Sequence, residues 1–448
     1  MPKKTLHSDN PRLLAAVTLA KVKNGAYSNL QLNQIIKQNP LKDQDKGLLT
    51  SLVYGTIQYR LLLEYWLAPF VKGKKMEPWL KELLLTALYQ WQKLDRIPKH
   101  ALFNETIEVA KTLGNVGAAK FVTAILHNMD RHGLPDPEKI QDDLKRLSIT
   151  YSVPVWLVEE LQDQVGTEKT ASILQSLNHA PEQSVRVNTV RATKALVRKQ
   201  LEDEGYTVRD GQLATDALIV SGGHVASSKA YQEGLLTVQD ESAMLPVEAM
   251  HIDQGVRSVL DAAAAPGGKT TQIAQDLPEG AFVTALDIHR HKVQLIAQNA
   301  ARLGLADRVR AMEMDAREIP EKLAEEFDRI LVDAPCSGLG LLRRKPEIRY
   351  DKTMDDVRHL SKLQLAILEA AATKLKKDGY LVYSTCTILN QENDEVVAAF
   401  LAKHPDFIQV KTETSRSIKS SRETLALKLY PDDFQTDGFY IATFQRKD

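Results

Sequence analysis

The chain has 448 residues, of which 43% are hydrophobic and 26% are charged, and its 58 basic side chains balance 58 acidic ones. This is the composition of a folded protein of several domains, and it excludes a disordered, collagen-like or coiled-coil chain. Two cysteines are too few for a disulfide framework, and no apolar stretch reaches the ~20 residues of a membrane span. Because residues 1–5 precede no apolar segment, we also expect no secretory signal and a cytoplasmic location.

Residues 1–145 show helical periodicity. Apolar side chains recur every three or four positions in stretches that begin at Leu13, Leu80 and Phe121. This part holds 21 basic and 14 acidic residues, a net charge of +7. A basic helical domain is typical of a module that faces a polyanion such as RNA, although solubility alone explains the same charge in many domains.

Residues 146–250 change to a mixed pattern, which predicts a small α/β domain. Ser242 is placed to cap a further helix at the end of this part. The other predicted elements are helices at 155–165 and 193–205 and strands at 184–189 and 235–239.

From about 257 onward strands and helices alternate in the manner of a doubly wound parallel sheet. Right-handed crossovers place the carboxyl ends of such strands at one edge, where ligands bind. We expect a mobile loop at 411–424 and a closing strand at 437–442. The predicted parallel strands lie at 258–260, 281–286, 309–312, 329–332 and 380–383, with the main helices at 291–303 and 356–376.

The first of these strands leads into a run of small residues and glycines, which lets a ligand approach the backbone at a helix N-terminus. A P-loop is disfavoured because Ala263 stands where that motif has glycine, and no dinucleotide-binding fingerprint occurs. The run is Ala263-Ala264-Ala265-Pro266-Gly267-Gly268-Lys269.

The next four strands end at Asp287, at Asp315, at Asp333 with Cys336, and at Cys386. Each acid alone is as readily a turn residue, but together they predict a ligand site at the sheet edge. The cysteines lie 50 residues apart without paired histidines, which does not fit zinc, and we expect no metal. Their polar loops favour a pair of reactive thiols over inert buried ones.

Residues from about 180 to the end resemble the RsmB/Fmu family of bacterial RNA cytosine-5 methyltransferases. Residues 1–145 are similar to the NusB-like RNA-binding fold, which is expected ahead of this catalytic domain. The family usually has cysteine at the position of Ala263, a difference that we interpret as tolerated variation in the cofactor loop. The resemblance is carried by Arg186-Val187-Asn188, Gln239-Asp240-Glu241-Ser242, Ala265-Pro266-Gly267-Gly268-Lys269-Thr270, Asp333-Ala334-Pro335-Cys336-Ser337-Gly338 and Ser384-Thr385-Cys386-Thr387.

The resemblance implies S-adenosylmethionine as methyl donor and an unpaired or flipped cytosine of 16S rRNA as substrate, at a site of the kind found at position 967. Cys386 is then the nucleophile and Cys336 assists product release. Asp333 contacts the cytosine and Lys269 orients the base or the thiolate. From the residues alone the choice of nucleophile stays open, because Pro335-Cys336 is similar to the nucleophile dipeptide of DNA cytosine methyltransferases. The implied cofactor-binding residues are Ala263, Ala264, Ala265, Pro266, Gly267, Gly268, Lys269, Asp287, Asp315 and Asp333.

The predicted chain is therefore multidomain and monomeric. A NusB-like helical RNA-binding domain spans 1–145, a small RRM-like α/β domain spans 146–250, and a Rossmann-like methyltransferase domain spans 251–448. Arg186 and Asn188 are expected to contact RNA. Two alternatives stay open: the same reaction on another rRNA or tRNA cytosine, and a non-catalytic RNA-binding assembly or antitermination factor.

Overall fold

The computed structural model describes residues 7–23, 28–95 and 97–447, and the chain divides into two compact units, Met1–Leu174 and Gln175–Asp448. The first residues, on which the prediction of no secretory signal rests, lie outside the described ranges. Within those ranges no helix is long and apolar enough to cross a membrane.

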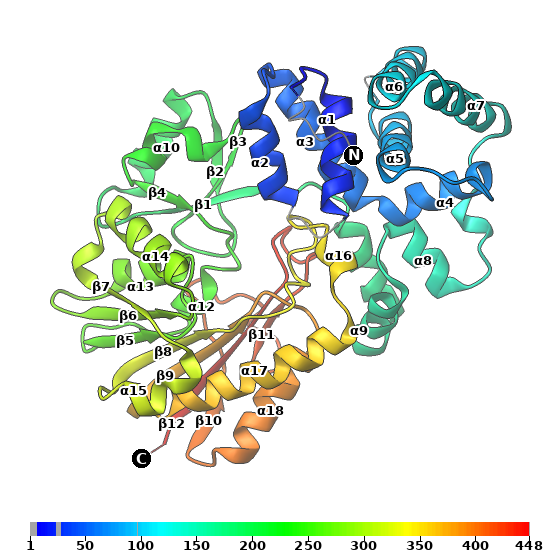
Figure 1. The fold of residues 1–448 in the computed structure, drawn as a ribbon. Helices are drawn as coiled ribbons and strands as arrows, with labels where there is room; N and C mark the ends of the chain where they lie inside the picture. The colour runs from blue at the N-terminus through cyan, green and yellow to red at the C-terminus, as the bar shows by residue number, and fades with distance from the viewer. Residues whose placement is uncertain (1–6, 24–27, 96, 448) are drawn as a thin grey trace. The chain divides into compact units, whose positions relative to one another are not determined.

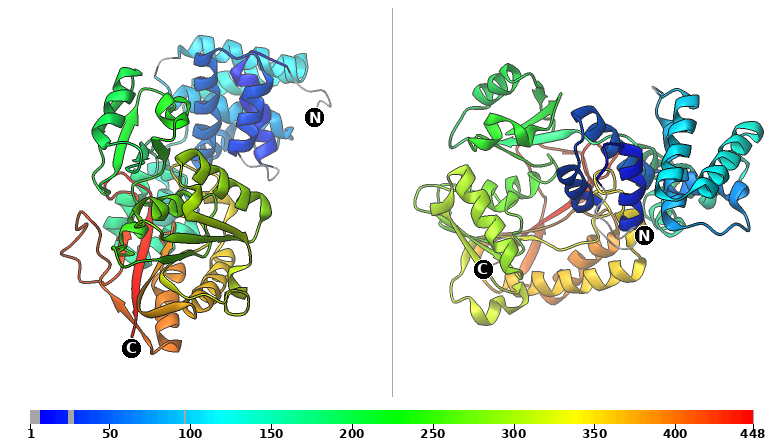
Figure 2. Two further views of the ribbon diagram at one scale, coloured as in Figure 1. Left: turned by 90° about the vertical axis from the view of Figure 1, so that its left-hand side faces the viewer. Right: turned by 45° about the horizontal axis from the view of Figure 1, so that its top comes forward.

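The described residues of the first unit form helices without strands, as predicted for residues 1–145, and residues 146–174, which were predicted to belong to the small α/β domain, continue this helical unit. Its helices are α1 (Pro11–Val22), α2 (Ser28–Gln38), α3 (Asp43–Gln58), α4 (Arg60–Val71), α5 (Pro78–Lys93), α6 (Lys99–Leu113), α7 (Val116–His132), α8 (Asp143–Tyr151) and α9 (Val155–Ser176). The three predicted apolar stripes lie on α1, α5 and α7, and their side chains Leu13, Leu80 and Ile125 are buried. In Figure 2, α6 and α7 lie side by side, and α1 packs against α3 and α5.

The second unit begins with a small sheet, which confirms the predicted α/β domain. Its elements are β1 (Gln183–Val187), α10 (Lys194–Asp203), β2 (Thr207–Asp210), β3 (Ala217–Ser221), α11 (Lys229–Gln232) and β4 (Leu236–Val238). The strands are antiparallel in the order β2-β3-β1-β4. One face of the sheet packs on α10, because Val185, Leu218 and Val220 share a buried cluster with Val197 and Leu201.

The predicted doubly wound sheet follows, and it contains an antiparallel part that the sequence pattern did not reveal. Its strands are β5 (Ser258–Asp261), β6 (Phe282–Asp287), β7 (Val309–Glu313), β8 (Phe327–Asp333), β9 (Leu375–Thr385), β10 (Phe407–Val410), β11 (Leu427–Leu429) and β12 (Phe439–Arg446). The order is β10-β12-β9-β8-β5-β6-β7. The strands β5 to β9 are parallel, whereas β12 is antiparallel to β9, β10 and β11.

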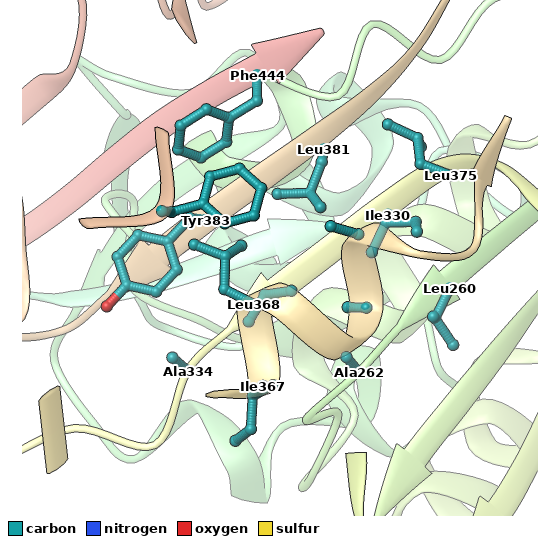
Figure 3. Close-up of a cluster of buried hydrophobic side chains, with 14 of the residues drawn as sticks. Leu260, Ala262, Ile330, Ala334, Ile367, Leu368, Leu375, Leu381, Tyr383 and Phe444 are labelled. Carbon is teal, nitrogen blue, oxygen red and sulfur yellow. The ribbon is translucent and has the colours of Figure 1, made fainter. Parts of the chain in front are cut away.

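Helices cover both faces of this sheet (Figure 1). They are α12 (Leu245–Glu248), α13 (Gly268–Asp276), α14 (Arg290–Leu303), α15 (Ile319–Lys322), α16 (Ile348–Asp351), α17 (Met354–Ala372) and α18 (Asp394–Lys403). Residues of α12, α13 and α14 share one buried cluster with the sheet, and residues of α15, α17 and α18 share the other. Figure 3 shows the second cluster, in which Leu368 of α17 lies near Tyr383 of β9 and Phe444 of β12. The strands are therefore buried on both faces, which leaves their ends for function.

Three local predictions differ from the structure. The helix predicted at 356–376 ends at Ala372 because β9 already begins at Leu375. Ser242 does not cap a helix: its hydroxyl donates to Asp240 Oδ1 at 2.6 Å, and α12 begins three residues later. The predicted loop at 411–424 has no helix or strand, but Arg422 fastens it by donating to backbone carbonyl groups within and beside it.

Candidate active site

A cavity of about 430 Å³ lies at the carboxyl ends of the parallel strands, at the predicted edge of the sheet. Its lining combines carboxylates, two cysteines and apolar side chains. The predicted site residues that line it are Ala263, Ala265, Asp287, Asp315, Asp333, Cys336 and Cys386. The apolar part of the lining includes Ile288, Met314, Ala334, Leu363 and Ile367. Residues up to 123 positions apart in the sequence thus meet around one space, from Ala263 to Cys386.

The loop after β5 is shaped by its glycine and by a buried acid. Gly267 has a φ of 101° at the start of α13, and a Cβ there would lie 3.1 Å from the Cα of Ile296. A side chain at this position would therefore be strained and crowded. Asp261 lies beneath the loop and accepts a hydrogen bond of 2.7 Å from Thr270 Oγ1. This bond ties the end of β5 to the first turn of α13.

Asp261 is expected to make stability depend on pH. Burial raises its pKa to about 7, although Thr270 donates to it. The folded state therefore holds a proton that the unfolded state releases, so the free energy of unfolding falls as pH rises from about 3.8 to about 7. The free energy of unfolding of Asp261→Asn lacks this pH dependence. Measured by urea unfolding, the difference in free energy of unfolding between the variant and the wild type should therefore shift in favour of the variant by a few kcal/mol from about pH 4 to about pH 8. Parallel pH profiles for the two proteins would contradict this.

Asp287 and Asp315 lie at the ends of β6 and β7, where a nucleoside was predicted. The amide of His289 donates to Asp287 Oδ1 at 2.8 Å. Asp315 accepts from both the amide and the guanidinium of Arg317, and these hydrogen bonds hold the pKa of Asp315 below its ordinary value. Arg317 was not predicted, since an exposed arginine in a turn carries no signal of its own. A carboxylate has about four acceptor sites, so Asp315 retains capacity for a further donor.

Asp333, at the end of β8, has a partner for each carboxylate oxygen. Lys269 Nζ lies 2.8 Å from Oδ2, and Ser384 Oγ donates to Oδ1 at 2.8 Å. The ammonium group of Lys269 also lies 4.9 Å from the centre of the Phe439 ring, which adds a cation–π contact. Lys269 and Asp333, which were predicted separately, thus form a pair that Ser384 and Phe439 also contact. Ser384 belongs to a motif already named from the sequence, whereas Phe439 on β12 was missed because it lies far along the chain.

The two cysteines are free thiols in direct contact, with their Sγ atoms 3.1 Å apart. The hydrogen bond with Cys386 and burial raise the pKa of Cys336 well above the ordinary value, and the charges of Glu392 and Asp333 add to the effect. Cys336 therefore remains a protonated thiol near neutral pH. The loops after β8 and β9 thus bring two thiols into contact at the lining of the cavity.

The prediction that Arg186 and Asn188 contact RNA is wrong in this structure, because both side chains are buried, at 1% and 2% exposure. Arg186 donates to Gln239 Oε1, to the Gly268 carbonyl at 2.7 Å and to Thr271 Oγ1 at 3.0 Å. Burial lowers its pKa to about 10.

Asn188 Nδ2 donates to the carbonyl groups of Gly234 and Leu303, each at 2.9 Å. Leu303 closes α14 of the large domain, and Gly234 precedes β4 of the small one. Arg186 and Asn188 therefore join the small sheet to helices α13 and α14. Among the described residues, no group of three or more His, Cys, Asp or Glu side chains is arranged to hold a metal ion.

Three protein-family models match separate ranges of the chain. The NusB family matches residues 9–131, the RsmF/B-like ferredoxin-like domain matches 153–226, and the 16S rRNA methyltransferase RsmB/F matches 249–445. The first two matches fall within the first two predicted domains, and the third begins two residues before the predicted third domain at 251; the predicted boundaries stay predictions.

Relatives match over nearly the whole chain. It is 43% identical over 442 residues to the probable ribosomal RNA small subunit methyltransferase B of Bacillus subtilis strain 168, covering 97% of this chain and 98% of the relative. It is 32% identical over 440 residues to the ribosomal RNA small subunit methyltransferase B of Serratia proteamaculans strain 568, with coverage of 97% and 98%. A solved methyltransferase homolog from Pyrococcus horikoshii, 27% identical, superposes with a TM-score of 0.59 over 68% of this chain and all of that chain. The predicted resemblance, fold class and cofactor class, S-adenosylmethionine, are thus confirmed, and the chain belongs to the RsmB/F family of 16S rRNA methyltransferases.

Proposed function

We propose that the protein methylates carbon 5 of a cytosine in 16S rRNA, at a site of the 967 kind, through a covalent bond between Cys386 and the base. The observation that carries the proposal is the contact of two cysteine thiols beside Asp333 at one end of the cavity. A reaction that needs one thiol to attack and a second proton-handling group requires this kind of pair.

The cavity fits S-adenosylmethionine in its donor set. Asp287 suits the ribose hydroxyl groups and Asp315 suits the adenine amino group, while Ile288, Met314 and Ile367 offer apolar contact to the ring. The backbone of residues 263–269 would hold the methionine end, beside the N-terminus of α13. When bound, the cofactor supplies an electrophilic methyl group. Alanine at 263 adds no bulk to this lining.

The cytosine ring must be activated before carbon 5 can accept a methyl group. Addition of the Cys386 thiolate to carbon 6 forms a carbon–sulfur bond and makes carbon 5 an enamine carbon, which is nucleophilic. After methylation, loss of the proton from carbon 5 re-forms the double bond and expels the Cys386 thiolate. Cys336, which lies 3.1 Å from Cys386, is placed to assist this elimination step.

Asp333 and Lys269 suit the recognition of the base. Asp333 can hydrogen-bond the cytosine edge and stabilise the ring in its protonated form. Lys269, which is 2.8 Å from Asp333, holds that carboxylate in place. The base reaches such a cavity only when it is unpaired or flipped out of its stack.

The substrate assignment rests on the whole chain as well as on the site. The relatives are named for the small ribosomal subunit RNA, and residues 9–131 match the NusB family. The basic charge of residues 1–145 suits contact with the phosphate backbone of RNA. From action on ribosomal RNA we infer a cytoplasmic location.

Bisulfite sequencing of RNA from a strain that lacks the gene tests this assignment. One 16S rRNA cytosine should lose its protection from conversion, and the wild-type gene should restore it, whereas a gene carrying Cys386→Ala should not. Loss of a methylated cytosine from tRNA or from another rRNA would support the alternative substrates. If no cytosine changes, the protein acts as a non-catalytic RNA-binding factor instead.

A further inference from the structure

A buried carboxylate, Glu392, grips the loop that carries Cys336. Glu392 is fully buried, and its Oε1 accepts from the Ser337 amide at 2.8 Å and from Gln364 Nε2 at 2.9 Å. Its Oε2 accepts from Ser337 Oγ at 2.5 Å. Gln364 Nε2 also donates to the carbonyl of Pro335 at 3.0 Å. Glu392 thus fixes both neighbours of Cys336: Ser337 by direct hydrogen bonds, and Pro335 through Gln364.

The next residue in the chain, Asn393, holds the other cysteine loop in the same way. Asn393 Oδ1 accepts from Thr385 Oγ1 at 2.6 Å, and its Nδ2 donates to the Thr387 carbonyl at 3.1 Å. Cys386 lies between these two threonines. Thr387 Oγ1 is in turn 2.8 Å from Ser337 Oγ, which links the two loops directly. Two consecutive residues therefore hold the two cysteine loops: Glu392 holds the loop of Cys336, and Asn393 holds the loop of Cys386.

The carboxylate also affects which thiol ionises. Among the described residues the side chain of Glu392 accepts hydrogen bonds from neutral groups, and no cation lies at hydrogen-bond distance from it there. The titratable groups that surround Cys336 are Cys386, Glu392, Asp333 and Tyr383. The contact with Cys386 and burial come first in raising the pKa of Cys336, and the charge of Glu392 raises it further.

We propose that Glu392 and Asn393 are positioning residues for methyl transfer: together they fix the two cysteine loops and so hold the two sulfur atoms in contact. The inference rests on the proposed function for its use of the two thiols. Neither residue reaches the cavity, so both act through the cysteine loops. Two adjacent buried side chains thus fix the loops of both cysteines.

The test measures thiol ionisation without RNA. Full-length protein carrying Cys386→Ser is alkylated with iodoacetamide between about pH 6 and about pH 10, which brackets the ordinary thiol pKa of about 8.5, and Cys336 modification is quantified by peptide mass spectrometry. Adding Glu392→Gln should raise the Cys336 alkylation rate at the lower pH values by up to about tenfold, the change that one pKa unit produces.

Glu241→Gln is the matched control. Glu241 is also a buried carboxylate, 5% exposed, and it accepts from the amides of Gln212, Leu213 and Ala214 in the same unit. Its replacement should lower the melting temperature without moving the Cys336 profile. If Glu392→Gln, folded by circular dichroism, leaves that profile unchanged, or if Glu241→Gln shifts it equally, the role of Glu392 is overturned.

Asn393→Ala tests positioning separately, and it serves also if Glu392→Gln does not fold. It should lower kcat by at least about tenfold with little change in KM for RNA, because Cys386 is misplaced only for the chemical step. A wild-type kcat would overturn its role. The proposed function fails on a different result: methylation that persists in Cys386→Ala, whatever the alkylation profiles show.

Discussion

Replacement of Cys386 by alanine is expected to abolish methyl transfer, by on the order of 10⁴-fold or more, as loss of a covalent nucleophile does in other enzymes. Replacement of Cys336 by alanine should instead leave a covalent protein–RNA adduct. The reason is that Cys336 assists the step that expels Cys386 from the methylated base, so its loss stalls the reaction after the carbon–sulfur bond has formed. Denaturing gels of each variant, incubated with S-adenosylmethionine and unmodified 16S transcript, measure the adduct.

The double variant provides the control, because an adduct that depends on Cys386 must disappear when both cysteines are replaced. An adduct formed only by Cys386→Ala would reverse the roles of the two sulfur atoms. The raised pKa of Cys336 favours the expected direction, since a protonated thiol is a poor nucleophile. If both single variants methylate RNA at the wild-type rate, the protein does not use a covalent bond between cysteine and the base.

Arg186→Ala is expected to destabilise the second unit by about 3 kcal/mol, which corresponds to a fall of roughly 6 to 10 °C in melting temperature. The substitution leaves a cavity. It also leaves two buried acceptors, Gln239 Oε1 and the Gly268 carbonyl, without the donor that the guanidinium provides. Differential scanning calorimetry of the full chain measures the change.

Arg191→Ala is the matched control for this prediction. Arg191 is exposed and donates to the carbonyl of Glu233 at 2.7 Å, so its loss should cost less than about 1 kcal/mol. Arg186→Ala protein that melts like the wild type but binds RNA more weakly would restore the original expectation that Arg186 contacts phosphate groups.

The cavity-forming residues could be predicted because a parallel sheet imposes a simple rule. Once strands are recognised by their apolar runs, the residues that follow them must meet at one edge. Asp287, Asp315, Asp333 and both cysteines were found in this way, and the structure places them around a single cavity. No knowledge of packing between helices was needed for that inference.

Arg186 and Asn188 show where such reasoning fails. Their alternation with Val185 and Val187 predicts a strand with one face in solvent, and an arginine there suggests contact with phosphate. In fact the second face of β1 is covered as well, because Arg186 bonds to α13, 82 and 85 positions along the chain. An alternating sequence pattern indicates which side chains lie on the polar face of a strand. It does not indicate whether another element of the fold covers that face.

The residues that hold the site residues in place, Glu392 and Phe439, could not be predicted from the sequence because they contact segments that are distant along the chain. Glu392 accepts a hydrogen bond from Ser337, which is 55 positions away in the sequence. Phe439, on β12, contacts the ammonium group of Lys269. Neither residue stands in a glycine-rich turn or at the end of a parallel strand. The Glu392 contact follows from the pairing of β8 with β9, and the Phe439 contact from the antiparallel insertion of β12 beside β9, which leaves no mark in the local pattern.

The place of β12 in the sheet has a consequence for how the protein is made. During synthesis on the ribosome, β10 and β11 emerge first but find no partner, because β12 is the strand that both of them pair with. Until β12 follows, the growing polypeptide exposes an open edge on β9, and Phe439 has not reached Lys269. Exposed edges invite aggregation. A premature stop codon before residue 439 should therefore yield an inactive product that chaperones must retain.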